Sequence, residues 1–422
     1  MPLMEATSIQ DDDRVTAPQP TTKAVDEGSL RYPGWRVVLV CFLAAVFCWG
    51  FGLYGHGVYL TELHRLHGWS TSLISGAVTG FYLLTAALVF FISDVIARLG
   101  PKRAMLGGAC CFGGAVVLLS VINAPWQLYP VYALMAAGAA TMHVGAISNV
   151  VGLWFDQKRA LAISLALNGA SSGGILVTPV LVLAIAHFGF ANAIAGSALV
   201  IAAVLLPAIA LWIDRPRTRA GGAAAALPSA LWNRRDALRS RAFWSVAAPF
   251  AMALTAQVGF LVHQIPILEP SIGRAQAGFS VAVLTVAAIS GRLALGAFAN
   301  RLDMRHFTAW SVASQAVALL AMAWTADITV LLIACAVYGL SAGNLITLPS
   351  LVIQREFEPA SFGMLVGLSW AASQFTYAFG PGLLGVLRDV TGSYGAPLAL
   401  CIALKLGAAA LILLRPRSDR AD

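Results

Sequence analysis

Arg292 is a charged side chain inside an apolar stretch of this chain, where charge is costly. Arg292 lies seventeen residues into an apolar run, and a charge at the centre of a bilayer costs at least about 2.5–3.5 kcal/mol. A planar guanidinium binds a carboxylate at two points. We therefore predict that Arg292 binds an anion; the alternative is a structural role in which it bonds helix carbonyls.

Neutral polar side chains are the other candidates for a binding site. His56, His143 and His263 lie in further apolar runs, and each could donate to an anion, take up a proton near neutral pH, or simply pack. Four more side chains could orient a ligand or only hold helices together: Tyr54, Gln264, Gln374 and Tyr377. Lys405 is expected to snorkel or to hydrogen-bond within the protein rather than touch a substrate.

Acidic side chains are absent from the predicted spans, apart from Asp94 at the edge of one. A cation pump normally needs carboxylates inside the membrane, so the substrate is predicted to be anionic or neutral. A single central arginine, with no lysine in the eleventh span, favours a small monocarboxylate over a dicarboxylate. Proton symport, uniport and exchange all stay open.

Other chemistries find no support in the sequence. There is no G-x-x-x-x-G-K-[ST] loop, no HExxH and no plausible Ser/His/Asp set, so neither an enzyme nor a nucleotide-driven pump is predicted. No cofactor, metal or nucleic-acid partner is expected. The six cysteines lie in apolar runs and are predicted to be buried thiols without disulfides.

The composition indicates what must position these residues. Of 422 residues, 59% are hydrophobic and 11% are charged, against about 25% charged in a soluble domain. An all-α integral membrane protein follows, because each span needs about 20 apolar residues. Twelve segments are predicted: 35–60, 70–97, 104–122, 128–153, 160–186, 190–213, 242–266, 275–299, 306–324, 328–353, 362–387 and 396–414.

The polar remainder divides the chain. Residues 1–31 and 416–422 are predicted tails, the first disordered, and 214–240 is a predicted linker between six-helix halves at 32–213 and 241–415. Of the 27 Lys and Arg, three lie in outer loops and two in spans, which leaves 22 on the inside. By the positive-inside rule, both termini and the linker are predicted to be cytoplasmic. The outer three are Arg65, Arg274 and Arg388.

Landmarks recur at nearly one offset along the chain. Arg98 and Arg301 are 203 residues apart, Pro179 and Pro381 are 202 apart, and His56 and His263 are 207 apart. This repetition predicts a duplicated six-helix unit and two halves related by pseudo-two-fold symmetry.

Several motifs carry a family resemblance. They are Trp154-Phe155, Lys158-Arg159-Ala160, Gly169, Ser172, Gly173, Pro179, His263, Gly291-Arg292, Gly296, Gly380-Pro381 and Thr391-Gly392-Ser393-Tyr394. With them, residues 33–414 resemble a major facilitator superfamily transporter, and most nearly the bacterial monocarboxylate transporter and oxalate–formate antiporter group.

The resemblance implies the major facilitator fold and two halves that rock about a site near Arg292 and His143. It also implies gating or conformational roles for Asp94, Arg98, Arg103, Arg159, Arg301, Gly169, Gly173, Pro179 and Pro381.

The sequence departs from the family pattern at four positions. Ala97 and Asn300 stand where an acid usually occurs in the two repeated loops, so the gate between the halves is expected either to be weakened or to use Asp94 instead. Animal monocarboxylate transporters carry an Asp where this chain has Ala288 and a Lys where it has Tyr54. Their proton-coupling scheme is therefore not carried over.

The sequence thus predicts a monomeric secondary transporter of a small organic anion in the plasma (inner) membrane, working by alternating access. Two alternatives stay open. One is efflux of a drug-like or neutral metabolite; the other is a membrane sensor that binds its ligand without moving it.

Overall fold

A computed structural model describes residues 27, 29, 31–155, 158–214, 232–298, 301–358 and 361–414 of the chain. The regular elements in these ranges are all helices. Most of the predicted tails and linker lies outside the described residues, namely 1–26, 215–231 and 415–422.

The first half of the chain forms one bundle. Its helices are α1 (Gly34–Trp49), η1 (Gly50–Tyr54), α2 (Gly55–His67), α3 (Thr71–Leu99), α4 (Pro101–Leu119), η2 (Pro125–Gln127), α5 (Leu128–Ala140), α6 (Val144–Gly152), α7 (Arg159–Phe188) and α8 (Phe190–Trp212).

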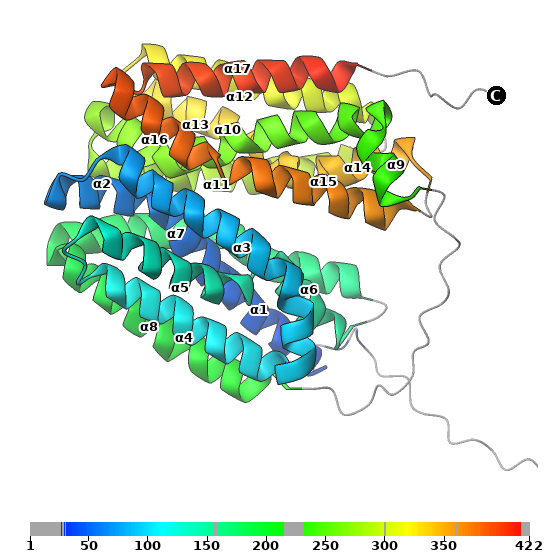
Figure 1. Ribbon diagram of the computed structural model, residues 1–422, viewed down its shortest axis with the longest axis horizontal. Helices are drawn as coiled ribbons and strands as arrows, with labels where there is room; N and C mark the ends of the chain where they lie inside the picture. The colour runs from blue at the N-terminus through cyan, green and yellow to red at the C-terminus, as the bar shows by residue number, and fades with distance from the viewer. Residues whose placement is uncertain are drawn as a thin grey trace, which may run out of the picture.

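The second half forms a second bundle of the same plan. Its helices are α9 (Arg234–Arg239), α10 (Arg241–Ile272), α11 (Arg274–Phe298), α12 (Met304–Trp324), α13 (Ile328–Ala342), η4 (Gly343–Ile346), α14 (Leu348–Glu356), α15 (Phe362–Tyr377), α16 (Gly380–Thr391) and α17 (Gly395–Leu413). Figure 1 shows the two bundles lying one against the other, with α3 and α16 side by side at their junction.

The bundle has two ends that differ in what they carry. We call the end where α1 begins and α8 and α17 finish the termini end, on the right in Figure 1. The opposite end, where the chain turns at Gly68, Gly189, Gly273 and Gly392, is called the far end. Large apolar side chains are exposed between the two ends, such as Trp310 and Val317, as expected for a surface that faces lipid.

Eleven helical stretches in the described part of the chain are long and apolar enough to cross a membrane. The eleventh predicted span differs, because it is divided into α15 and α16 by a break at Ala378 and Phe379. Gly380 and Pro381 follow the break, and proline is favoured in the first turn of a new helix. The two short helices together occupy the place of that span, in keeping with the predicted plan of two six-helix halves.

The first and seventh spans are longer than predicted. α2 continues to His67 and α10 to Ile272, so the helical spans also carry Glu62 and Glu269. The prediction that Asp94 is the one acidic residue within a span is therefore wrong. The predicted spans end where the apolar residues stop, whereas the helices continue into a packed and partly polar end of the bundle.

Small residues bring helix backbones into contact within each half. A Cβ added at Gly169 would lie 2.1 Å from the carbonyl oxygen of Phe42, and one at Gly173 would lie 2.5 Å from that of Val46. The G-x-x-x-G step thus seats α7 against α1. In the second half, a Cβ at Gly380 would lie 2.5 Å from the carbonyl oxygen of Thr255, so α16 meets α10 in the equivalent way.

We predict that Gly169→Ala lowers the free energy of unfolding by about 1–3 kcal/mol, because the added methyl group forces α1 and α7 apart. Thermal unfolding of the purified protein in detergent measures it. Gly196→Ala on the exposed face of α8 is the control, since a Cβ there meets no atom within 4 Å. Equal melting temperatures for the two variants would contradict the packing argument.

Candidate functional site

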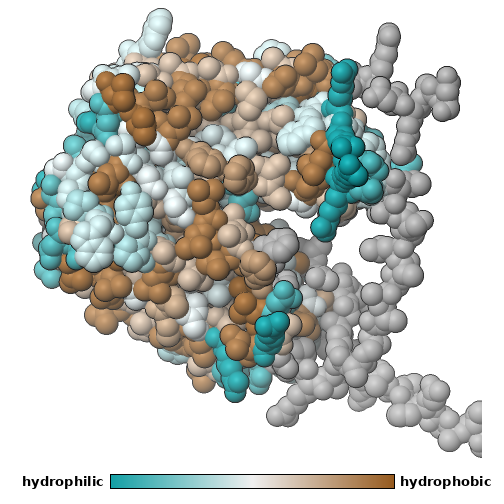
Figure 2. Space-filling model, in the orientation of Figure 1, coloured by the Kyte–Doolittle hydropathy of each residue, from teal (hydrophilic) through white to brown (hydrophobic). Residues whose placement is uncertain are grey.

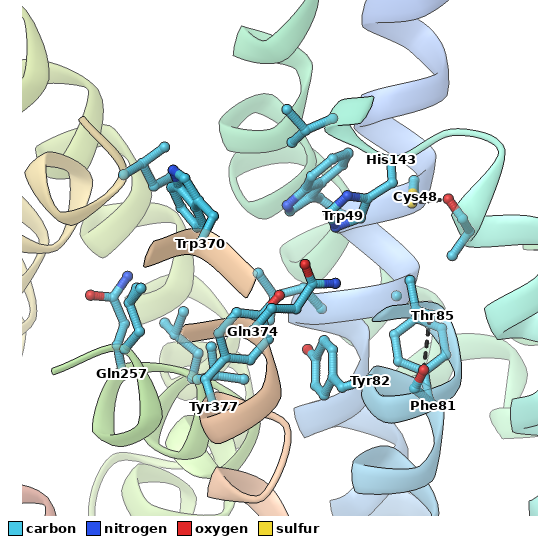
Figure 3. A pocket seen from close by; sticks show the side chains of 18 residues that line it. Cys48, Trp49, Phe81, Tyr82, Thr85, His143, Gln257, Trp370, Gln374 and Tyr377 are labelled. Carbon is cyan, nitrogen blue, oxygen red and sulfur yellow. Dashed lines mark hydrogen bonds between the residues drawn. The ribbon is translucent and has the colours of Figure 1, made fainter. Parts of the chain in front are cut away.

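A cavity of about 160 Å³ lies between the two halves. Figure 3 shows side chains of both halves pointing toward one another across it. Its wall combines aliphatic and aromatic side chains with two amides and an imidazole. The lining residues are Cys48, Trp49, Gly52, Leu53, Phe81, Tyr82, Thr85, Ala139, His143, Val144, Leu254, Gln257, Val258, Leu261, Ile346, Trp370, Gln374 and Tyr377.

His143 reaches the cavity because the fourth span is interrupted. α5 ends at Ala140 and α6 begins at Val144, which leaves His143 in extended backbone as the residue before α6. Its ring stacks on that of Trp49, with centroids 5.3 Å apart. The first N–H groups of a helix have no carbonyl partner within it, and Val144 at the start of α6 lines the cavity. The wall therefore holds a positive helix end beside an imidazole.

The C-terminal half contributes the opposite wall. Gln374, Tyr377 and Trp370 come from α15, and Gln257 comes from α10. The Nε2 atom of Gln257 donates to the carbonyl oxygen of Ala342 at 3.5 Å, while its Oε1 atom has no protein partner. Gln374 and Tyr377 are where the sequence predicted ligand contacts; Gln257 and Trp370 were missed.

The broken helices explain why polar groups meet here. The first span contains the π-helical turn η1 at Gly50–Tyr54, and the tenth contains the 3-10 turn η4 at Gly343–Ile346. π-Helical turns occur frequently at functional sites, and Gly52 and Leu53 of η1 line the cavity, as does Ile346 of η4. Irregular backbone at membrane depth is tolerated where it faces protein or a cavity.

Arg292 lies beside the cavity and does not line it. Its Nε donates to the carbonyl oxygen of Gly343 at 3.3 Å, and its Nη2 atom approaches the Ser171 hydroxyl at 3.5 Å. Ser171 belongs to α7, so the arginine joins the two halves where α7 and α11 pack. Tyr54 interacts with Thr285 and Arg292 at the same interface. A role in anion binding therefore stays a prediction, with η4 as the element that separates Arg292 from the cavity.

Three other predicted ligand-binding residues lie elsewhere. His263 contacts the carbonyl oxygen of Pro381 at 3.0 Å and the Tyr394 hydroxyl at 3.2 Å, which secures the start of α16. Gln264 donates to the Ser280 hydroxyl at 2.9 Å inside the second half. His56 is fully buried among aromatic rings of the first half.

Lys405 has the protein-side hydrogen bond that the sequence predicted. It is fully buried, and its Nζ atom donates to the carbonyl oxygen of Ala253 at 2.8 Å and to the Gln315 side chain. It lies within the second half and does not line the cavity.

Comparison with known proteins identifies the family. Residues 40–381 match the sequence profile of the Major Facilitator Superfamily. The chain belongs to this superfamily. Two related transporters align with most of the chain. Human monocarboxylate transporter 12 is 24% identical, covering 87% of this chain and 77% of its own. The aspyridones efflux protein apdF of Emericella nidulans is 23% identical, covering 92% and 78%.

A solved structure has the same fold. The nucleoside transporter NupG superposes with a TM-score of 0.73 over 91% of this chain and all of its own, at 13% sequence identity. The protein is thus a multi-pass membrane transporter of the major facilitator fold, with a small molecule as its substrate.

Ion pairs close the far end of this transporter. Glu62 of α2 is 1% exposed and pairs across the halves with Arg274 at 2.6 Å and within its own half with Arg65 at 2.8 Å. Arg274 also pairs with Glu269, and Arg388 pairs with Asp389. Each of the three basic residues predicted for the outer loops is therefore neutralised by an acid.

Asp389 makes a second link between the halves. Its Oδ2 atom accepts from the Ser72 N–H at 2.6 Å, at the start of α3. Partial burial by itself would raise the pKa of Asp389, but the hydrogen bonds from Ser72 and Arg388 outweigh it and hold the pKa below its ordinary value. The carboxylate therefore stays ionised as pH falls through its ordinary range, and the link weakens only as pH reaches the lowered pKa.

The termini end is different. Figure 2 shows the surface hollowed between the halves there. Asp94 is exposed on α3 and makes no ion pair with any described residue; Arg98, Arg103 and Arg301 are exposed at the same end. α7 begins at Arg159, whose side chain lies outside the description, and Pro179 lies within α7. The gating roles of these residues stay predictions.

We predict that Glu62→Gln favours opening of the far end, because it removes the ionic link between α2 and α11. Val121→Cys and Ala326→Cys place spin labels at exposed far-end sites in opposite halves, after Cys110 and Cys111 have been replaced by Ala. Double electron–electron resonance then measures the distance between the two labels. The state with the longer distance should be stabilised by about 1 kcal/mol relative to the state with the shorter distance. This is roughly a fivefold change in the ratio of their populations.

The matched control for that experiment is Glu358→Gln, which changes an exposed carboxylate at the termini end. It should leave the distance distribution as in the parent protein. If Glu62→Gln gives that same unchanged distribution, the ion pair does not hold the far end closed.

Proposed function

We propose that this protein transports a small organic anion, a monocarboxylate, by alternating access of the cavity between its halves. The termini end faces the cytoplasm of a plasma (inner) membrane in this proposal, supported by the excess of Lys and Arg at that end. The structure then represents the inward-open state, in which the far-end ion pairs close the outer side.

The cavity wall is the observation that carries the proposal. It contains no Asp or Glu, and its polar groups gather where His143 precedes the start of α6. A helix N-terminus that faces a cavity favours negative charge, and half-helices at the midplane bind anionic substrate groups in other transporter folds. A carboxylate fits this end of the cavity, and the apolar part of the substrate fits against Trp49 and Trp370.

Size favours a small substrate. The cavity measures about 160 Å³, whereas sites for drug-sized ligands run to about 300–1,000 Å³. The printed name of the human relative, a monocarboxylate transporter, agrees with a small acid.

Arg292 supplies the strongest nearby positive charge in this proposal. It is held by Gly343 of η4 and by Ser171 of α7, so its position responds to movement of one half on the other. We infer that the carboxylate lies within the field of this guanidinium and that closure of the inner side brings the two together.

A second function has specific support. Five lining side chains besides His143 carry aromatic rings, and no lining side chain has a permanent charge. A flat neutral metabolite would stack in such a cavity, and one relative is named as an efflux protein. Efflux of a neutral aromatic compound is therefore the alternative, and it predicts indifference to the charge at position 292.

We predict that Arg292→Gln slows uptake of labelled pyruvate or lactate into proteoliposomes by at least about 30-fold, since loss of one partner of a desolvated charge pair costs about 2–5 kcal/mol. Arg292→Lys keeps the charge but not the planar fork, so it should retain intermediate activity. Arg234→Gln, an exposed arginine on α9, is the control.

The outcomes separate the candidates. Full monocarboxylate uptake by Arg292→Gln would remove this arginine from the site. Transport of neutral aromatic compounds, with no organic acid moved under any gradient, would replace the first proposal with the second.

A further inference from the structure

Buried polar atoms without protein partners cluster behind the cavity wall. Both ring nitrogens of His56 and the hydroxyls of Tyr59, Tyr82 and Tyr132 have no hydrogen-bond partner in the protein. The four side chains are at most 9% exposed. Buried polar groups normally find a partner, and ordered water supplies one where the protein does not. This concentration of unpaired donors and acceptors therefore indicates a small hydrated site.

Four aromatic rings surround the imidazole of His56. The imidazole stacks on Tyr132, with centroids 5.3 Å apart and planes at 29°, and meets Phe81 at 5.0 Å, Tyr82 at 5.8 Å and Tyr59 at 6.1 Å in edge-on contacts. These five residues, from α2, α3 and α5, are called the His56 box.

The box adjoins the cavity and the junction of the halves. Phe81 and Tyr82 line the cavity, and the Tyr82 ring is 5.8 Å from that of Tyr377, which lines it from the other half. A Cβ added at Gly57 would lie 3.0 Å from the carbonyl oxygen of Val262 on α10. The box thus borders the cavity through Phe81 and Tyr82, and α2 touches the opposite half.

No fixed charge faces the box in the part of the chain that the structure describes. The titratable groups that face it are Tyr59 on α2, Tyr82 on α3, Tyr132 on α5, and Cys48 on α1 beside Tyr82. α10 presents backbone there. An imidazolium in such surroundings is stabilised by ring faces and hydroxyl oxygens, and additionally by an anion in the cavity, because charges interact strongly where water is scarce.

We propose that the His56 box binds the proton that accompanies the organic anion. A hydronium ion that reaches the box from the cavity past Tyr82 transfers its proton to the lone pair of a ring nitrogen of His56, and a water molecule is left behind. Bound anion and bound proton stabilise each other, so the neutral pair forms together. On the other side of the membrane, His56 gives its proton back to water and the anion leaves the cavity. This inference rests on the proposed transport of an organic anion.

The test measures proton and anion movement together in proteoliposomes that enclose a pH-sensitive dye. The parent protein should take up protons with labelled pyruvate. His56→Gln should lower the number of protons per pyruvate by about 10-fold or more, flatten the pH dependence of uptake, and retain pyruvate exchange across the membrane. His187→Gln, an exposed histidine at the end of α7, should behave as the parent.

Shape-conserving variants protect the test against misfolding. Tyr132→Phe and Tyr59→Phe keep the rings of the box and remove only the hydroxyls, so each should lower proton coupling while leaving the melting temperature close to that of the parent. If His56→Gln does not fold, these two variants decide, and unchanged coupling in both overturns the proposal.

Two results point at different claims. Unchanged proton-to-pyruvate ratio and pH dependence in folded His56→Gln, or pyruvate transport by the parent without any proton movement, overturns the His56 proposal alone. Failure of the parent to move any organic acid instead contradicts the proposed function, on which this inference depends.

Discussion

Close contact between α3 and α16 determines the state in which this transporter is seen. A Cβ at Gly385 would lie 1.8 Å from the Ser75 hydroxyl oxygen, and the Gly382 N–H donates to Thr79 at 3.0 Å. Backbones this close exclude water and lipid and bring the far ends of the halves together. The halves are in contact at the far end and diverge toward the termini end, where the surface is hollowed between them.

Charge is distributed in accordance with that geometry. The acidic side chains Glu62 and Asp389 link the halves at the far end, and none of the residues that line the cavity is acidic. The far-end link through Asp389 stays intact at neutral and mildly acidic pH, since the pKa of this carboxyl is lowered. Titration of this link therefore does not produce pH dependence near neutrality. His56 and His143 are histidines placed next to or at the cavity.

Much of the fold could be predicted from the sequence because lipid imposes a simple demand. Apolar runs of sufficient length, basic loops on one side and landmarks at one offset predicted the helical plan, and the family comparison confirms it. The interruptions at His143, in η4 and between α15 and α16 were missed. They lie within uniformly apolar sequence, where hydropathy cannot distinguish a continuous helix from two half-helices that meet at a cavity.

The candidate site was predictable in part for the same reason. His143, Gln374 and Tyr377 stand out as polar residues in apolar runs and do line the cavity, whereas Gln264 and His263 have the same signature and bond within their own half. Gln257 is seven residues before Gln264 on the same helix. The two lie on nearly the same face of α10, about two turns apart. Which of them lines the cavity therefore depends on how far along α10 the cavity extends, and periodicity does not report that.

The most direct test of the account is whether a transported acid occupies the cavity between the halves. Val144 lines it and is exposed, so Val144→Cys, in a protein whose six native cysteines are replaced, can be labelled by a small thiol reagent added at the termini end. The account predicts that saturating pyruvate or another transported monocarboxylate slows this labelling, and that an equal concentration of a non-transported anion does not. Labelling at the same rate with and without the transported acid would contradict it.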